Sequence, residues 1–166
     1  YGMRRALLEG ANQKERVLDI VRGIVGQFSD LRCPEKAHPD EYDLTGLQSD
    51  VLTQFGVKIV PQDLAGMTRV ELEDAIVDKL TARYQEKEDL VGEEMMRQAE
   101  RIVMLNIIDN QWKDHLLSMD HLKEGIGLRG YGQKDPLIEY KRESFTMFQE
   151  MMDRIEDDSI RYLFFL

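Results

Sequence analysis

The chain has 166 residues, and its 22 Lys and Arg residues face 32 Asp and Glu residues, a formal net charge of −10. This acidic balance argues against general nucleic-acid binding, because a protein that binds the phosphate backbone needs a basic surface. The single cysteine, Cys33, excludes an internal disulfide and a cysteine-based zinc cluster within the chain.

The first third of the chain has helical spacing that is broken by proline. Asn12 is a candidate N-cap for a helix. Apolar residues then recur at steps of three and four and predict one buried face: Val17, Ile20 or Val21, Ile24, Phe28 and Leu31. Pro34 and Pro39 follow within six residues, which predicts a linker because proline cannot continue a helix.

The next segment predicts two further helices. Residues 43–55 carry regularly spaced apolar side chains, and residues 57–60 are expected to be a brief extended piece. Thr68 with Glu71 three residues later forms a capping-box pattern, so a helix is expected to start there. Gly92 is the next position at which a helix is expected to end.

The C-terminal part predicts two long helices, residues 93–124 and 136–165, joined by a loop at 125–135. The first helix carries an apolar series that includes Trp112 as a structural anchor: Ile102, Leu105, Ile108, Trp112, Leu116, Met119, Leu122 and Ile126. The second begins with Pro136 behind an Asp135 N-cap. Its series has one polar interruption, at Ser159: Phe145, Phe148, Met152, Ile155, Tyr162 and Leu166. Two such helices predict an antiparallel hairpin in an all-α fold.

The motifs that could carry chemistry are not supported by their context. Residues 125–130, GIGLRG, match the spacing of a dinucleotide fingerprint, but they follow a predicted helix where that fingerprint needs a strand. The chain contains no P-loop sequence. His115 and His121 lie six residues apart and therefore do not share a helix face, so we expect neither a metal site nor a catalytic site.

The connecting loop is the best candidate contact site. It contains four glycines together with Leu128, Arg129, Tyr131, Gln133 and Lys134. Two antiparallel helices need only about two to eight connecting residues, so a longer loop with a tyrosine and two cations suggests a contact role. The alternative is a loop whose tyrosine folds back onto the hairpin.

Methionine is frequent in the predicted hairpin, at positions 95, 96, 104, 119, 147, 151 and 152. Methionines fill irregular gaps between helices, but they also form adaptable binding surfaces. A helical adaptor or chaperone module that binds amphipathic segments in a methionine-rich groove is therefore an alternative function. No apolar run approaches the roughly 20 residues that a membrane span requires, so any membrane role is expected to be peripheral.

Several long motifs resemble the SecA family of preprotein translocase motors. Residues 108–116, IDNQWKDHL, and residues 125–136, GIGLRGYGQKDP, are similar to two irregular SecA patterns. Residues 139–145, EYKRESF, follow as in that family, and residues 84–88 and 92–96 also resemble it. Residues 10–83 match only in general style. The first residue is Tyr1 and the last four are apolar, so we expect a piece of a longer protein.

The resemblance implies three segments: the tail of a long scaffold helix at 1–9, a helical wing domain at 10–92, and a two-helix finger at 93–166. It implies no catalytic residue, cofactor or metal in this chain, because the ATP- and magnesium-binding motor domains of the family lie outside it. The implied whole protein pushes unfolded preproteins through the SecYEG channel and works on the cytoplasmic face of the bacterial inner membrane. Expected partners are the channel, the preprotein, the protein's own motor domains and, for the full-length protein, a second copy.

The implied contact residues of the finger tip are Leu128, Arg129, Tyr131, Gln133 and Lys134. In the family the finger also regulates ATP hydrolysis.

Overall fold

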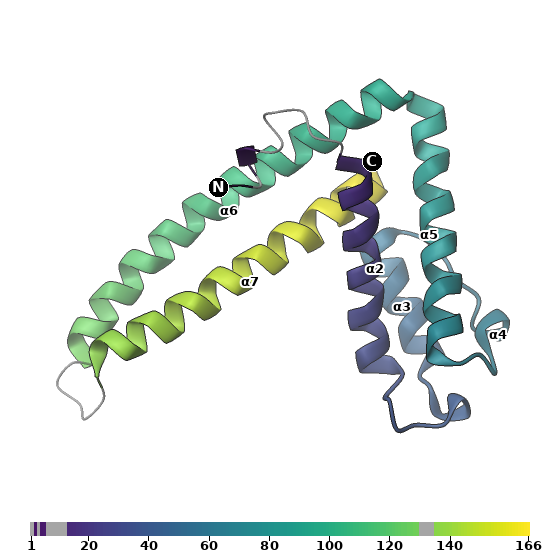
Figure 1. Ribbon diagram of the computed structural model, residues 1–166, viewed down its shortest axis with the longest axis horizontal. Coiled ribbons are helices and arrows are strands. Elements are labelled where there is room, and N and C mark those ends of the chain that lie inside the picture. Colours follow the sequence, from purple (N-terminus) through teal and green to yellow (C-terminus); the bar gives the residue numbers. More distant parts are fainter. Residues whose placement is uncertain (1, 3, 6–12, 130–134) are drawn as a thin grey trace.

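The computed structural model describes residues 2, 4, 5, 13–129 and 135–166. Within these residues the regular structure is entirely helical, and no strand is present. The predicted all-α class is therefore confirmed. The fold consists of a small helical bundle and a long helical hairpin (Figure 1).

The small bundle, which we define as α2 to α5, is built from the first half of the chain. A 3-10 turn lies in the predicted linker, and the predicted extended piece at 57–60 leads into a short helix that the sequence did not indicate. The elements are α2 (Gln13–Arg32), the 3-10 turn (Pro39–Glu41), α3 (Leu44–Phe55), α4 (Pro61–Leu64) and α5 (Arg69–Val91).

Two helices of the bundle have side-chain caps, of which the sequence predicted the one at Thr68. The Asp43 carboxylate accepts a hydrogen bond from the Gly46 amide at 2.9 Å and caps α3. The Thr68 hydroxyl accepts from the Glu71 amide at 3.3 Å and donates to the Glu71 carboxylate at 3.0 Å. Each cap satisfies amide groups that the first turn of a helix leaves without a partner. The predicted Asn12 cap lies outside the described residues.

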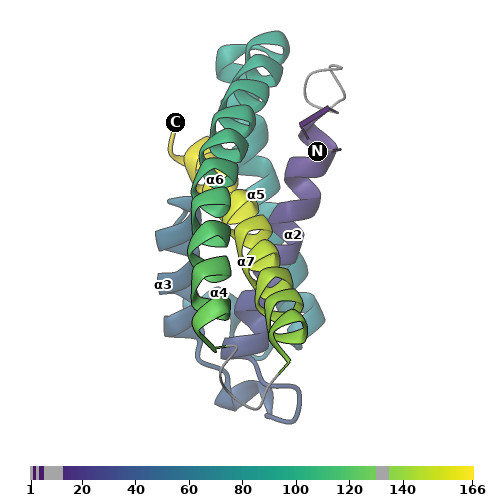
Figure 2. The ribbon, with the colours of Figure 1, turned by 90° about the vertical axis from the view of Figure 1, so that its left-hand side faces the viewer.

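The hairpin consists of α6 (Glu93–Arg129) and α7 (Pro136–Phe165), which run antiparallel beside each other (Figures 1 and 2). The Arg154 side chain of α7 donates to the Gln111 side chain of α6 at 3.0 Å. The loop predicted at 125–135 is shorter in the structure, because α6 continues five residues beyond residue 124. Gly125 does not end the helix, since Ile126 after it is still buried against the partner helix.

A sharp corner joins the small bundle to the hairpin at Gly92, between α5 and α6 (Figure 1). Gly92 has φ 93° and ψ 147°, a backbone conformation that side-chain-bearing residues rarely adopt. Its amide still bonds the Glu88 carbonyl at 2.7 Å, so α5 is closed correctly before the chain turns. The predicted break at Gly92 is confirmed.

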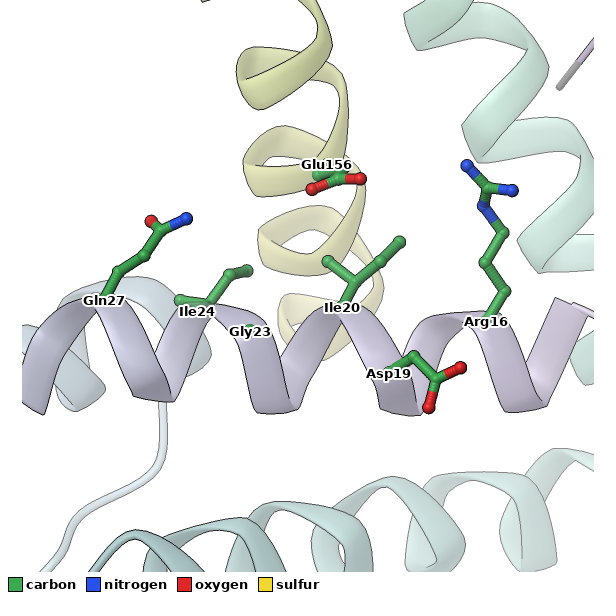
Figure 3. Close-up of a pocket in the computed structure, with 7 residues that line it drawn as sticks. All are labelled: Arg16, Asp19, Ile20, Gly23, Ile24, Gln27 and Glu156. Carbon is green, nitrogen blue, oxygen red and sulfur yellow. The ribbon is translucent and has the colours of Figure 1, made fainter. Parts of the chain in front are cut away.

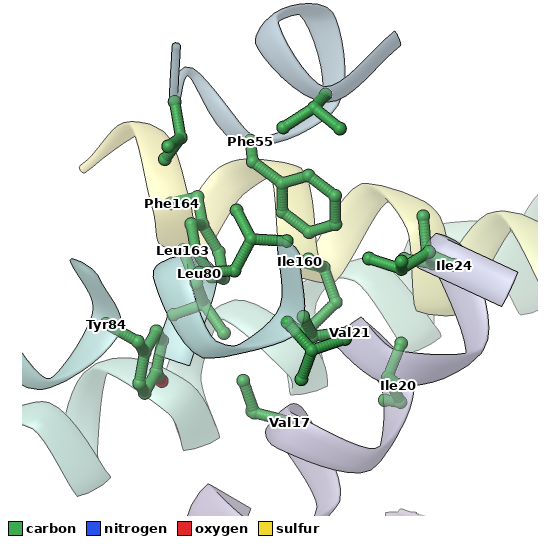
Figure 4. Packing of buried hydrophobic residues seen from close by; sticks show 14 of the residues in the cluster. Val17, Ile20, Val21, Ile24, Phe55, Leu80, Tyr84, Ile160, Leu163 and Phe164 are labelled. Carbon is green, nitrogen blue, oxygen red and sulfur yellow. The ribbon is translucent and has the colours of Figure 1, made fainter. Parts of the chain in front are cut away.

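One hydrophobic core connects the two parts. The last turns of α7 pack among α2, α3 and α5 (Figure 4). The Phe164 ring lies 5.0 Å from the Phe55 ring and 5.5 Å from the Tyr84 ring, measured between centroids. Cys33 is also buried in this core, and burial raises the pKa of its thiol.

The predicted apolar series was wrong at several positions. The exposed members are Leu31, Ile102, Leu116, Phe145, Tyr162 and Leu166. In α2 the buried face drifts toward Val25, Ser29 and Cys33, which leaves Leu31 outside. In α7 the predicted interruption at Ser159 is fully buried, because the small bundle covers a second face of the helix there.

The residues described before α2 are helical and lie against the hairpin. The Arg4 guanidinium pairs with the Asp109 carboxylate of α6 at 2.8 Å. The assignment of residues 1–9 to the tail of a scaffold helix, and the division at residue 92, remain proposals.

Candidate functional site

The end of α6 and the start of α7, which border residues 130–134 of the predicted contact loop, lie at the end of the hairpin that is farthest from the small bundle (Figure 1). Leu128 and Arg129 belong to the last turn of α6, although their side chains are not described. Tyr131, Gln133 and Lys134 lie outside the described residues. The contact role of all five therefore stays a prediction.

The return helix begins as the sequence predicted. Pro136 is the first residue of α7, and the Asp135 carboxylate accepts a hydrogen bond from the Leu137 amide at 3.0 Å. The Glu139 amide bonds the Asp135 carbonyl at 3.1 Å. This cap fixes where the second helix leaves the loop.

The far half of the hairpin presents apolar side chains to solvent. About three fifths of each is exposed, a fraction similar to that of Leu31 and Tyr162 elsewhere in the chain. We call this set the distal apolar residues: Leu116, Leu117, Leu137, Ile138 and Phe145. Exposed cations accompany them at Lys113, Lys141 and Arg142. Sequence periodicity missed this set because it assigned Leu116 and Phe145 to the buried face.

The middle of the hairpin holds an aromatic cluster. Trp112 is half-buried, and its ring centroid lies 5.4 Å from His115 and 6.0 Å from Phe148. His115 is only 7% exposed and stacks edge-on at 6.1 Å from the same Phe148 ring. His121 is exposed, so the two histidines do not meet. Trp112 packs against the core, and its role as an anchor remains a prediction.

A buried ionic cluster, unforeseen from the sequence, joins α5 to the start of α6. The Glu88 carboxylate contacts Lys14 and lies 2.6 Å from the Arg97 guanidinium, while Arg97 also lies 2.8 Å from Glu100. The Tyr84 hydroxyl donates to Glu100. Spacings of four and three residues along each helix place these groups on one face, which is the only signal that could have indicated the cluster.

Burial and ion pairing shift the pKa values of the groups in this cluster in opposite directions. Burial raises the pKa of Glu100, and burial with the neighbouring Glu100 carboxylate raises the pKa of the Tyr84 phenol far above its ordinary value. Burial also acts to raise the pKa of Glu88, but Lys14 and Arg97 outweigh it and leave that pKa lowered. The cluster therefore holds an ionised Glu88 between two cations, which is a structural arrangement.

Two of the surface hollows near the base of the hairpin lie against α7. One, of about 270 Å³, lies between α2 and α7, where Arg16 and Glu156 stand above Ile20 (Figure 3). The other, of about 430 Å³, lies along α6 and the end of α7 and is lined by Ile102, Tyr162 and Leu166 among others. Neither contains a nucleophile beside a base.

The described residues contain neither a metal-binding cluster nor a membrane-spanning helix. Among the residues that the structure describes, no three His, Cys, Asp or Glu side chains gather in a way that could hold a metal ion. Over those same residues, no helix combines the length and the apolar character needed to cross a bilayer.

Comparison with known proteins gives a consistent family assignment. The family described as SecA Wing and Scaffold domain matches residues 1–166. The chain is 61% identical over 166 residues to the protein translocase subunit SecA of Solibacter usitatus (strain Ellin6076) and 50% identical over 169 residues to that of Koribacter versatilis (strain Ellin345). Both alignments cover 100% of this chain.

A more distant relative is the protein translocase subunit SecA of Pseudomonas fluorescens (strain Pf0-1), 40% identical over 167 residues and 98% of this chain. The chain spans 17% of the length of each of the first two relatives and 18% of the third. The matched region is thus one segment of those proteins.

Proposed function

Because this chain belongs to the SecA family, as the wing and scaffold part of a protein translocase, we propose that it is the mechanical and regulatory module of an ATP-driven motor. The whole protein would push unfolded preproteins through the SecYEG channel across the bacterial inner membrane. ATP and magnesium would be bound by motor domains outside this chain. The chain itself would be non-catalytic.

The observation that carries this proposal is the shape of the hairpin. α6 and α7 project away from the small bundle, so the end of α6 and the start of α7 lie farthest from it (Figure 1). The distal apolar residues and their neighbouring cations give this end a surface that tolerates many peptide sequences, because apolar area is insensitive to sequence. We propose that the tip, Leu128 to Lys134, contacts the translocating polypeptide and the channel mouth.

The base of the hairpin would carry the regulatory role. The ionic cluster of Glu88, Arg97 and Glu100 ties α6 to the small bundle and would pass a displacement of α6 on to that bundle. We propose that contact with the motor domains here modulates ATP hydrolysis. The module would act on the cytoplasmic face of the membrane, bound peripherally, and the full-length protein could form a homodimer.

The central experiment replaces Tyr131 in the full-length protein. Tyr131→Ala should lower preprotein translocation into inverted membrane vesicles by about tenfold, which corresponds to loss of a contact worth roughly 1.4 kcal/mol. Tyr131→Phe should keep most of the activity because the ring remains. Lys134→Ala is the matched control and should have a smaller effect, because an exposed cation contributes little alone. Translocation at the parental rate by Tyr131→Ala would remove the tip from the mechanism.

The alternative of an adaptor with a methionine-rich groove has less support. Met96, Met104 and Met151 are buried in the core, and of the seven hairpin methionines only Met95 is exposed. The two functions can be separated by adding this chain to the remaining domains of a SecA protein. A motor module should dock and change the rate of ATP hydrolysis, whereas an independent adaptor should leave that rate unchanged.

A further inference from the structure

The end of α7 is held by the small bundle through polar as well as apolar contacts. Gln54 of α3 is only 5% exposed, and it faces α7 at a point where both helices are packed. Its amide nitrogen donates to the Asp157 carbonyl at 2.8 Å. Its amide oxygen accepts from the Arg161 guanidinium at 2.9 Å from Nη2 and 3.3 Å from Nε.

These two contacts lie one helical turn apart on α7. Asp157 and Arg161 are four residues apart, so the single amide bridges a carbonyl and a guanidinium stacked on one face. The Gln54 amide donates one hydrogen bond to α7 and accepts another from it. Together these bonds fix the rotation of α7 about its own axis and its position along that axis. Apolar packing alone does not select one register, because it is non-directional.

Apolar contacts beside Gln54 join the same two helices. Phe55, next to Gln54, packs edge-on against Phe164 at 5.0 Å. A Cβ atom at Gly56 would lie 2.9 Å from the Phe165 ring, so the backbone of α3 approaches α7 closely at the following residue as well. Three successive residues at the end of α3, 54 and 55 in the helix and Gly56 at its C-cap, therefore lie close to the last turns of α7.

The other helix of the hairpin is attached separately. Glu88 and Tyr84 of α5 hold Arg97 and Glu100 at the start of α6. The hairpin is thus fixed at two points, one on each of its helices. A body that is held at two points can turn only about the line that joins them.

We infer that Gln54 is a positioning residue: it sets the direction in which the hairpin leaves the small bundle and thereby where the tip lies. This inference rests on the proposed function only for its consequence, since the position of the tip matters if the tip contacts the polypeptide. The small bundle is then the mount of the hairpin. A partner that displaces the bundle displaces the tip with it.

The test measures the direction of the hairpin in the full-length protein by pulsed electron paramagnetic resonance. One spin label replaces Lys79, exposed on α5, and the other replaces Lys123, exposed near the far end of α6. The parent should give one narrow distance distribution. Gln54→Leu keeps a side chain of similar size, removes both hydrogen bonds, and should broaden the distribution at least twofold.

Gln48→Leu is the matched control. Gln48 lies on the same helix, and its amide nitrogen donates to the Ile59 carbonyl at 2.9 Å, a bond inside the small bundle. This variant loses an equivalent hydrogen bond but should leave the distance distribution narrow. A second label pair inside the bundle, at Asp19 and Lys79, should be unaffected by either variant.

Arg161→Met provides a second route if Gln54→Leu folds poorly, because Arg161 is on the exposed side of the contact. It should broaden the distribution less, since the Asp157 bond remains. An unchanged distribution in both Gln54→Leu and Arg161→Met would overturn the inference, as would equal broadening in Gln48→Leu. These outcomes do not depend on translocation. The proposed function is judged separately by the Tyr131 variants.

Discussion

The indole of Trp112 lies against His115 and Phe148 where the two long helices face each other. Trp112→Ala should lower the free energy of unfolding by about 2 kcal/mol, less than the ~3–5 kcal/mol of a fully buried ring, because the indole is only half-buried. Trp112→Phe should lose less. Urea denaturation measures both. Leu116→Ala, on the exposed side of the same helix, is the control, and a Trp112→Ala loss no greater than that of Leu116→Ala would place Trp112 outside the packing.

The contribution of the Glu156 carboxylate of α7 to the free energy of unfolding depends on pH. Burial raises its pKa, and Asp153 and Asp157 on the same helix act in the same direction, while Arg16 of α2 opposes them. The native state therefore holds the proton more tightly than the unfolded chain, where the pKa is about 4.5. The contribution of Glu156 to stability falls as pH rises through the raised native value.

Glu156→Gln should accordingly raise the melting temperature by roughly 2 °C at pH 8 and by less at pH 4.5. Glu150→Gln, exposed on the same helix, removes the same charge as a control and should show no comparable difference between the two pH values. Melting curves of the parent protein and of the two variants at both pH values measure these differences. Equal gains for the two variants would mean that net charge alone, and not burial at Glu156, sets the effect.

The residues at which helices begin were easier to predict from the sequence than the residues that are buried along each helix. Thr68, Asp135 and Pro136 start helices because their own chemistry supplies or replaces a hydrogen bond of the first turn, which needs no knowledge of the tertiary fold. The exposure of Ile102 and Phe145 depends on which neighbour covers each face, and periodicity does not contain that information. The Gln54 contact has no local signal at all, since its partners are more than 100 residues away.

The backbone conformation at the corner between α5 and α6 predicts how a substitution of Gly92 changes stability. Gly92→Ala should destabilise the protein by about 1–3 kcal/mol, because φ 93° with ψ 147° is strained for any residue with a Cβ atom although no other atom obstructs one there. Gly23→Ala, inside α2 with equally open space, should instead stabilise by about 0.5–1 kcal/mol. Chemical denaturation should show these opposite signs. The same sign for both would mean that the corner relaxes without cost.

At the scale of the whole molecule, the family resemblance carried more information than the residue patterns. Patterns alone predicted a hairpin and a separate group of shorter helices, and the structure contains both. They did not predict that α7 ends inside the core of the small bundle, because this depends on contacts between residues far apart in the sequence. The position of the tip relative to the bundle therefore follows only from the structure.

The proposal that nucleotide is bound outside this chain gives a prediction for the isolated chain. It should not bind Mg-ATP, because its sequence lacks a P-loop that could cradle phosphates at a helix N-terminus. Calorimetric titration should give no saturable heat, whereas the full-length protein should give a saturable signal under the same conditions. Micromolar binding by the isolated chain would show that a nucleotide site had been missed.

Because α7 is long, a small rotation of the small bundle produces a large displacement at the far end of the hairpin. From Pro136 to Asp157, where Gln54 holds it, α7 spans roughly 32 Å, so a rotation of the small bundle by about 10° moves the far end of the helix by about 6 Å. An extended polypeptide advances about 3.3 Å per residue, so under the proposed function this displacement equals roughly two residues of the translocated chain. That displacement would be set by the angle through which the small bundle turns, and a hairpin of half this length would need twice the angle to move the same stretch of chain.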